Sequence, residues 1–135
     1  MGFNDSILVI DDDPMIIQLL CDGLGHAGYR VSSATDAMQA VIQAQALRPK
    51  LIISDIQMPA FGTGLEAYAN LRKIPSLKNT PVIFLTAMPP FEAKKLMPVS
   101  DPKVRLLSKP IDWVMLEQAI QEFLGDGKSL GGKQP

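Results

Sequence analysis

Short β-favouring runs that alternate with amphipathic segments are the feature of this sequence that most restricts its fold. Residues 7–10 form a continuous apolar run, and further strand-like runs lie at 29–31, 51–53, 81–85 and 104–107. Such short runs are typical of strands that are buried on both faces, and the segments between them have helical spacing. This alternation predicts an α/β fold with a parallel sheet, right-handed crossovers and helices on both faces.

Capping signals indicate where the first two helices begin and end. Pro14 suits the first turn of a helix over 15–27, and Gly28 follows where a helix stop is expected. Asp36 and Gln39 have the spacing of a capping box, which predicts that the second helix begins there.

The later helices are less regular. Leu65, Tyr68 and Leu71 mark a third helix, whereas prolines on both sides of 91–97 leave room for only about two turns in the fourth. Asp112 is the expected N-cap of the last helix. The inward face of that helix should carry Trp113, Leu116, Ile120 and Phe123.

The composition excludes several classes of function. At 135 residues the chain has room for one domain, and 13 basic against 14 acidic residues give no electrostatic footprint for nucleic acid or an anionic membrane. The apolar runs are far too short to cross a bilayer. A single cysteine, Cys21, and the absence of a signal-peptide pattern at the N-terminus predict a cytoplasmic protein.

Polar residues follow four of the predicted strands, at the point where each strand ends. They are Asp11-Asp12-Asp13 after the first strand, Asp55 after the third, Thr86 after the fourth and Ser108-Lys109-Pro110 after the fifth. Because the carboxyl ends of parallel strands meet at one edge of the sheet, we expect these side chains to lie together.

These residue types suit phosphoryl transfer assisted by a metal. Carboxylates about 4 Å apart repel by about 4 kcal/mol at an effective dielectric near 20, so a cation is expected among them. Oxygen ligands without histidine or cysteine favour Mg²⁺. Lys109 and Thr86 offer a positive charge and a hydroxyl to phosphoryl oxygens, and a carboxylate can itself be the nucleophile.

The strand ends resemble the response-regulator receiver family of two-component signalling, and the resemblance extends over 5–124. The matching segments are Val9-Ile10-Asp11-Asp12, Ser54-Asp55-Ile56-Gln57-Met58-Pro59, Leu85-Thr86-Ala87 and Ser108-Lys109-Pro110. The resemblance implies a doubly wound (βα)5 fold with flavodoxin-like strand order 2-1-3-4-5. Residues 5–124 would be the receiver domain, and 125–135 a disordered tail or the start of a linker.

The same resemblance implies a Mg²⁺ site. Asp12, Asp55 and the carbonyl of Gln57 would hold the ion, with Asp11 reaching it through water. Asp13 is instead expected to be an acid at the start of the first helix.

The resemblance also assigns roles in phosphorylation. Asp55 would accept a phosphoryl group from a histidine kinase or a histidine phosphotransfer protein. Thr86 and Lys109 would contact the phosphoryl oxygens, with a cis bond between Lys109 and Pro110. Such a domain catalyses only its own phosphorylation and dephosphorylation, and then changes how it binds a downstream protein.

The sequence departs from the family pattern on the side that would signal onward. Leu106 stands where the family usually has the aromatic residue that switches together with Thr86, and prolines interrupt the fourth helix. The loop 60–65 is one residue longer than usual. The downstream target cannot be read from these residues, and homodimerisation stays open.

Two alternatives remain to be weighed. Asp11-Asp12-Asp13 also fits the Asp-x-Asp of haloacid-dehalogenase-like phosphatases, with Asp11 as nucleophile, but Met15 and the short chain do not fit that family. A degenerate receiver could act as a docking module without phosphorylation, although the complete set of acids, Thr86 and Lys109 argues against it. Whether the chain acts alone or is part of a longer regulator stays open.

Overall fold

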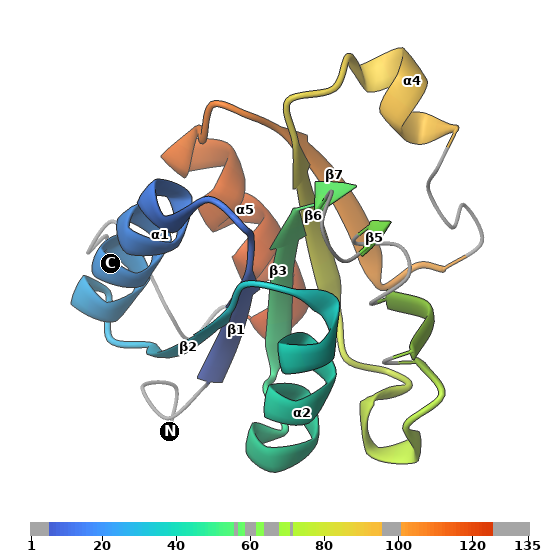
Figure 1. Ribbon diagram of the computed structural model, residues 1–135. Helices are drawn as coiled ribbons and strands as arrows, with labels where there is room; N and C mark the ends of the chain where they lie inside the picture. Colours follow the sequence, from blue (N-terminus) through green and yellow to red (C-terminus); the bar gives the residue numbers. More distant parts are fainter. Residues whose placement is uncertain are drawn as a thin grey trace.

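Five parallel strands form the central sheet of the computed structural model, which describes residues 6–55, 57–58, 62–63, 68–70, 72–95 and 101–125 (Figure 1). The strands are β1 (Ser6–Ile10), β2 (Arg30–Ala34), β3 (Leu51–Asp55), β6 (Val82–Thr86) and β7 (Val104–Ser108). Their order in the sheet is β2-β1-β3-β6-β7. Counted along the chain, this is the order 2-1-3-4-5, so the expected doubly wound α/β fold is confirmed.

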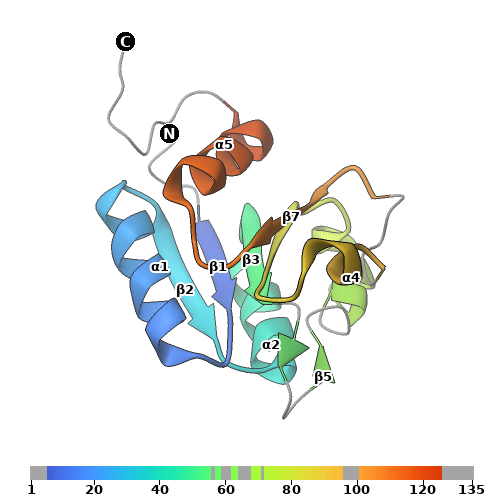
Figure 2. The ribbon, with the colours of Figure 1, turned by 90° about the horizontal axis from the view of Figure 1, so that it is seen from above.

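Helices cover both faces of this sheet (Figure 2). They are α1 (Pro14–His26), α2 (Ala37–Leu47), α4 (Pro90–Lys94) and α5 (Trp113–Leu124), with a 3-10 turn at Pro75–Leu77. α1 and α5 pack on one face and α2 on the other. Residues 68–70 and 72 are also helical. With five residues, α4 is as short as the flanking prolines predict.

Alternating side chains of the strands give the sheet a separate core on each face. Ile7 and Val9 of β1 lie in the core beneath α1 and α5, whereas Leu8 and Ile10 lie in the core beneath α2. Full burial of one such side chain is worth about 1.5–3 kcal/mol. Packing on both faces therefore holds the strands, and with them the residues at their ends, in fixed positions.

The packing of α5 on α1 depends on Gly23 in the middle of α1. A Cβ added at Gly23 would lie 2.4 Å from the Cη2 atom of Trp113, so the ring would have to move away. Glycine in a helix interior costs about 1 kcal/mol relative to alanine. The absence of a side chain is what allows the Trp113 ring to lie against α1.

The helix starts agree with the capping signals in most details. Asp36 accepts a hydrogen bond from the Gln39 backbone N–H at 2.7 Å, and Asp112 caps α5. The Gln39 side chain bonds the backbone N–H of Thr35, whereas a complete capping box would use that of Asp36. β2 begins at Arg30 and extends to Ala34, further than the short run of apolar residues indicated.

One small element was not expected from the sequence. Gln57–Met58 (β4) pairs antiparallel with Gly62–Thr63 (β5) in the loop after β3. Leu65, Leu71 and the tail from residue 126 lie outside the described residues, so the predictions about them stay predictions.

A polar cluster ties the helical segment around Arg72 to the segment that leads into β7. Arg72 Nε lies 3.2 Å from Asp101 Oδ2, which also accepts a hydrogen bond from the Tyr68 hydroxyl. Arg72 Nη1 donates to the carbonyls of Leu77 at 3.0 Å and Thr80 at 2.6 Å. The Arg72 and Asp101 side chains are only 14% and 20% exposed, so the cluster is shielded from water.

The surroundings of Asp101 favour its charged form. Burial raises the pKa of this carboxyl, but hydrogen bonds from Tyr68 and the Lys103 backbone N–H, together with the charge of Arg72, outweigh it. The net effect is a pKa below the usual 3.8. The ionised carboxylate therefore stabilises the fold above the pKa of the unfolded chain, and this contribution is lost as the pH falls through the folded-state pKa.

We expect Asp101→Asn to lower the free energy of unfolding by about 1–3 kcal/mol at neutral pH, because it removes the charge from a largely buried ion pair. The difference from wild type should shrink as the pH falls below the usual pKa of 3.8, where the unfolded chain takes up a proton first, and it should vanish only below the lower pKa of the folded state. Urea unfolding at several pH values measures this. Glu122→Gln, which removes the exposed partner of Arg105, is the matched control and should change little. Equal losses in both variants would contradict a structural role for the cluster.

Candidate functional site

Four strands deliver polar side chains to the same edge of the sheet. Asp11 follows β1, Asp55 ends β3, Thr86 ends β6 and Lys109 follows β7. The Lys109 backbone N–H donates to the Thr86 carbonyl at 2.7 Å, which extends the pairing of β6 and β7 up to the lysine. The Lys109–Pro110 peptide bond is cis, as the resemblance implies. The structure thus brings together the strand-end residues singled out in the sequence.

The ammonium group of Lys109 lies between two buried carboxylates. Its Nζ atom is 2.9 Å from Asp11 Oδ2 and 3.7 Å from Asp55 Oδ2. Burial lowers the pKa of Lys109, but the hydrogen bond and charge of Asp11 and the charge of Asp55 outweigh it and raise the pKa above the usual 10.5. Lys109 is therefore positively charged at neutral pH and offsets the repulsion between the two acids.

Three carboxylates could hold a divalent cation at this edge. One oxygen from each of Asp11, Asp12 and Asp55 lies within 4.8 Å of the others. Asp11 and Asp55 are buried, whereas Asp12 is exposed. Oxygen donors alone fit Mg²⁺, which keeps several of its waters and needs only one or two carboxylates. Gln57 begins β4, and a ligand role for its carbonyl stays a prediction.

Asp11 and Asp13 are both held by local hydrogen bonds. Asp13 Oδ1 accepts from the Met15 backbone N–H at 2.9 Å and thereby caps α1. The Asp13 backbone N–H donates to Asp11 Oδ1, also at 2.9 Å. Both oxygens of Asp11 thus have donors, one from Asp13 and one from Lys109. Direct contact with a cation is therefore easier for Asp12 and Asp55.

The hydroxyl of Thr86 is oriented by its own loop. Its Oγ1 accepts a hydrogen bond from the Met88 backbone N–H at 2.9 Å, and the Thr86 residue is only 2% exposed. A hydroxyl that accepts one bond can still donate its proton to another acceptor. Met88 itself is half-buried and packs against the core beneath α2.

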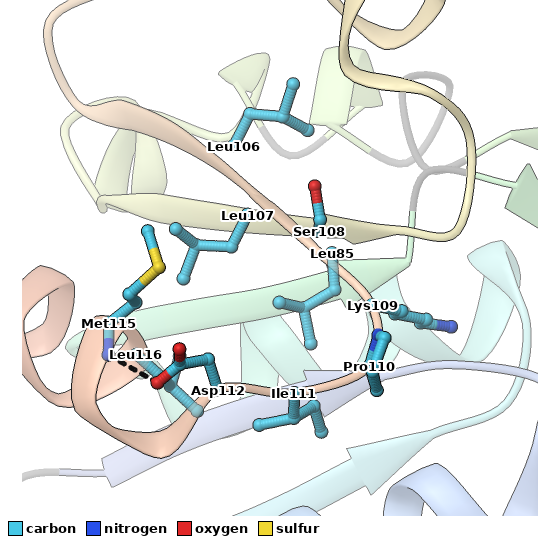
Figure 3. A pocket seen from close by; sticks show the side chains of 10 residues that line it. All are labelled: Leu85, Leu106, Leu107, Ser108, Lys109, Pro110, Ile111, Asp112, Met115 and Leu116. Atoms are coloured by element: carbon cyan, nitrogen blue, oxygen red, sulfur yellow. Dashed lines mark hydrogen bonds between the residues drawn. The ribbon is translucent and has the colours of Figure 1, made fainter.

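Leu106 lies on β7, where its side chain contacts one of the two cores of the sheet. Leu106 and Leu107 leave β7 on opposite sides (Figure 3). Leu106 packs against the core that contains Phe84, whereas Leu107 packs against the core beneath α5. A pocket of about 320 Å³ beside β7 and the start of α5 is lined by both leucines and by Met115. A switching role for Leu106 stays a prediction.

An aromatic ring does reach this region, but from another element. The Tyr68 ring meets the Phe84 ring edge-on, with centroids 6.0 Å apart, in the same core that Leu106 contacts. In the sequence, Tyr68 was recognised only as one apolar residue of a helix face. No local pattern could have shown its approach to β6, because the contact joins segments that are distant along the chain.

Comparison with known proteins identifies the family. The sequence profile named Response regulator receiver domain matches residues 7–121. The chain belongs to this family. The receiver domain is 28% identical over 127 residues to the polar-differentiation response regulator DivK of Brucella anthropi, covering 90% of this chain and 97% of DivK. An uncharacterised 14.6 kDa protein of Leptolyngbya boryana is 33% identical over 118 residues, covering 87% of this chain and 88% of that protein.

Solved structures show the same fold. The chemotaxis protein CheY4 of Vibrio cholerae superimposes on the receiver domain with a TM-score of 0.80 at 32% identity, covering 89% of this chain and 98% of CheY4. The receiver domain of the sensor histidine kinase PA1611 from Pseudomonas aeruginosa gives a TM-score of 0.80 at 26% identity, covering 91% and 99%. That structure has a magnesium ion coordinated in its active-site cleft.

Membership of the family fixes the class of function. Receiver domains act in two-component signalling, together with histidine kinases and downstream effectors, and are not classical enzymes. The phosphatase alternative is therefore wrong.

Within the described part of the chain, no helix combines the length and apolar character that a membrane span requires.

Replacing Asp12 should separate metal binding from folding. We expect Asp12→Ala to abolish Mg²⁺ binding and to leave the free energy of unfolding unchanged or raised, because removal of an exposed acid lessens the repulsion with Asp11 and Asp55. Calorimetric Mg²⁺ titration and urea unfolding measure the two effects. Asp13→Ala is the matched control: it should lose about 1 kcal/mol of stability with its helix cap, yet keep metal binding. A titration that Asp12→Ala leaves unchanged would exclude Asp12 as a ligand.

Proposed function

We propose that the chain accepts a phosphoryl group onto Asp55 from a phosphohistidine of a histidine kinase or a histidine phosphotransfer protein, in a reaction that requires Mg²⁺. The observation that carries this proposal is the position of the Lys109 ammonium, 2.9 Å from Asp11 and 3.7 Å from Asp55, beside the cluster of three acids. A fixed cation next to a carboxylate nucleophile suits stabilisation of the charge on a phosphoryl group.

The sheet order favours Asp55 over Asp11 as the acceptor. Asp55 ends the central strand β3, with the acids after β1 on one side and Thr86 of β6 on the other. A phosphoryl group on Asp55 would therefore lie between the acids that could hold a cation and the donors Thr86 and Lys109. Asp11 lies one strand further from Thr86, and its two oxygens are already engaged by Asp13 and Lys109.

The proposed transfer uses Asp55 as the nucleophile, with Lys109 and Thr86 as contacts for the phosphoryl oxygens. An oxygen of the Asp55 carboxylate attacks the phosphorus, and the P–N bond to the donor imidazole breaks. The electron pair of that bond stays on the imidazole nitrogen, and an acyl phosphate forms on Asp55. Lys109 and the free proton of the Thr86 hydroxyl contact the phosphoryl oxygens as charge develops on them. Mg²⁺, when bound by Asp12 and Asp55, supplies further positive charge to the same oxygens.

Phosphorylation would change the contacts of the residues that also hold the edge of the sheet together. Lys109 would exchange part of its interaction with Asp11 for the phosphoryl group, and Thr86 would turn its hydroxyl toward it. Leu106 of β7 is paired with Phe84, two residues before Thr86 on β6, and packs against the core beneath α2. The change would reach an unidentified downstream protein through the surface near α4 and β7.

A reducing cytoplasm suits a chain with the free Cys21.

Asp55→Asn is expected to abolish phosphorylation by acetyl phosphate and Mg²⁺, because an amide cannot form the acyl phosphate. Intact-mass spectrometry should show one added phosphoryl group on the wild type that hydroxylamine removes, and none on the variant. Asp13→Asn, beside the site, should still be modified. Undiminished label in Asp55→Asn, or label mapped to Asp11, would refute the assignment.

The role of the Thr86 hydroxyl can be tested with two substitutions of similar size. Thr86→Val removes the hydroxyl without changing the shape of the side chain, and should slow phosphorylation by about tenfold if one contact in the transition state is worth ~1.4 kcal/mol. Thr86→Ser keeps the hydroxyl and should stay close to the wild-type rate. Rapid-mixing kinetics with acetyl phosphate measures both. Equal rates in the two variants would show that the hydroxyl takes no part.

A further inference from the structure

A basic pocket lies at the end of the sheet opposite the acidic site. Its volume is about 370 Å³, and its lining includes the side chains of Arg30, Arg48 and Lys50 together with the hydroxyls of Ser6 and Ser32. None of the described residues that line it carries a carboxylate. The pocket is therefore positively charged in a chain whose overall net charge is −1.

The fold, and not a local run of basic residues, brings these charges together. Arg30 begins β2, Arg48 is the C-cap of α2, and Lys50 directly precedes β3. The Lys50 backbone N–H donates to the Ser6 carbonyl at 2.8 Å, which holds this segment against the start of β1. In Figure 1, the C-terminal end of α2 lies beside the amino-terminal ends of the strands, away from α4.

The three cations have no acidic partner among the described residues. The ion pairs of that part of the chain use Arg72, Arg105 and Lys109, and no carboxylate hydrogen bond reaches Arg30, Arg48 or Lys50. Like charges gathered without a counter-charge repel one another. An anion from solution would remove that repulsion.

Arg48 also has an unfavourable backbone conformation. Its φ of 48° makes it the one residue other than glycine with positive φ in the described segments. Glycine is the usual residue at such a helix end, since it has no side chain to hinder the left-handed conformation. Strained positions of this kind are frequent where a side chain clamps a ligand. Here the strained position carries the guanidinium of Arg48, which lines the basic pocket.

A second pocket extends the basic one. Arg48 and Lys50 also line a hollow of about 340 Å³, together with Ser76, Asn79 and Thr80. The two cations thus line both hollows, and each hollow also offers hydroxyl groups. Charged donors flanked by hydroxyls suit the oxygens of phosphate groups. Pockets of roughly 300–1,000 Å³ are typical of sites for small molecules.

We propose that this basic pocket binds a small molecule with two or more phosphate charges, held by Arg30, Arg48 and Lys50. Three cations are too few for a nucleic-acid surface, which needs an extended basic stripe. The proposal is independent of phosphorylation at Asp55, because it rests on residues at the opposite end of the strands.

Pyrophosphate is the probe for the test, and inorganic phosphate the comparison with fewer charges. Titration without metal ions, at constant ionic strength and followed by backbone amide chemical shifts, should give saturable changes at the starts of β1 and β2. Pyrophosphate should bind at least tenfold more tightly than phosphate. Shifts confined to Thr86 and Lys109, or no saturable shift, would overturn the proposal.

Arg48→Gly is the decisive variant, because glycine favours the observed φ. We expect it to be as stable as wild type or more stable in thermal unfolding, while its affinity for pyrophosphate falls at least tenfold. Lys50→Gln should weaken binding similarly, and Lys94→Gln on α4 is the matched control that should not change it. Unchanged affinity in Arg48→Gly and Lys50→Gln would refute the site. Phosphorylation by acetyl phosphate should be normal in both, so this test stands whether or not Asp55 is the phosphoacceptor.

Discussion

Repulsion among the carboxylates at one edge of the sheet is the constraint on which the site depends. Two such charges about 4 Å apart repel by about 4 kcal/mol at an effective dielectric near 20. The Lys109 ammonium offsets part of this by lying 2.9 Å from Asp11 and 3.7 Å from Asp55. One internal cation against three acids leaves the site with an excess of negative charge. This negative charge favours the binding of a second cation. A bound cation would in turn reduce the repulsion between the acids and an approaching phosphoryl group.

That arrangement is possible only because the strands cannot move apart. Each of the central strands β1, β3 and β6 is buried on both faces, so a shift of one strand would disturb two cores. The Lys109 backbone is bonded to the Thr86 carbonyl, and Asp11 is bonded through its backbone to the Ala34 carbonyl of β2. The side chains of the site are therefore fixed by the sheet.

The polar residues at the strand ends could be predicted from the sequence because each directly follows a short apolar run. A short apolar run that stops at Asp11 or Asp55 predicts a strand and identifies the residue at its carboxyl end. Parallel pairing of the strands then places these residues at the same edge of the sheet. Contacts between distant segments were not readable. The bond from Tyr68 to Asp101 joins residues 33 positions apart, and β4 and β5 are too short for any pattern of apolar residues to show. The basic pocket could not be predicted for the same reason, since Arg30 and Arg48 become neighbours only through the packing of α2 beside β2.

The two ends of the sheet are electrostatically separate. β1 runs from Ser6 at the basic pocket to the residue before Asp11 at the acidic site. A strand of five residues spans roughly 17 Å at a rise of about 3.3 Å per residue. The Debye length at physiological ionic strength is about 8 Å, so a charge at one end is largely screened at the other. An anion beside Arg48 would therefore not change the acidic site by its field alone. Any influence on Asp55 would have to pass through a displacement of β1 or β3, and the packing on both faces of these strands opposes it. Binding at the basic pocket and phosphorylation at Asp55 are for this reason expected to be additive rather than cooperative.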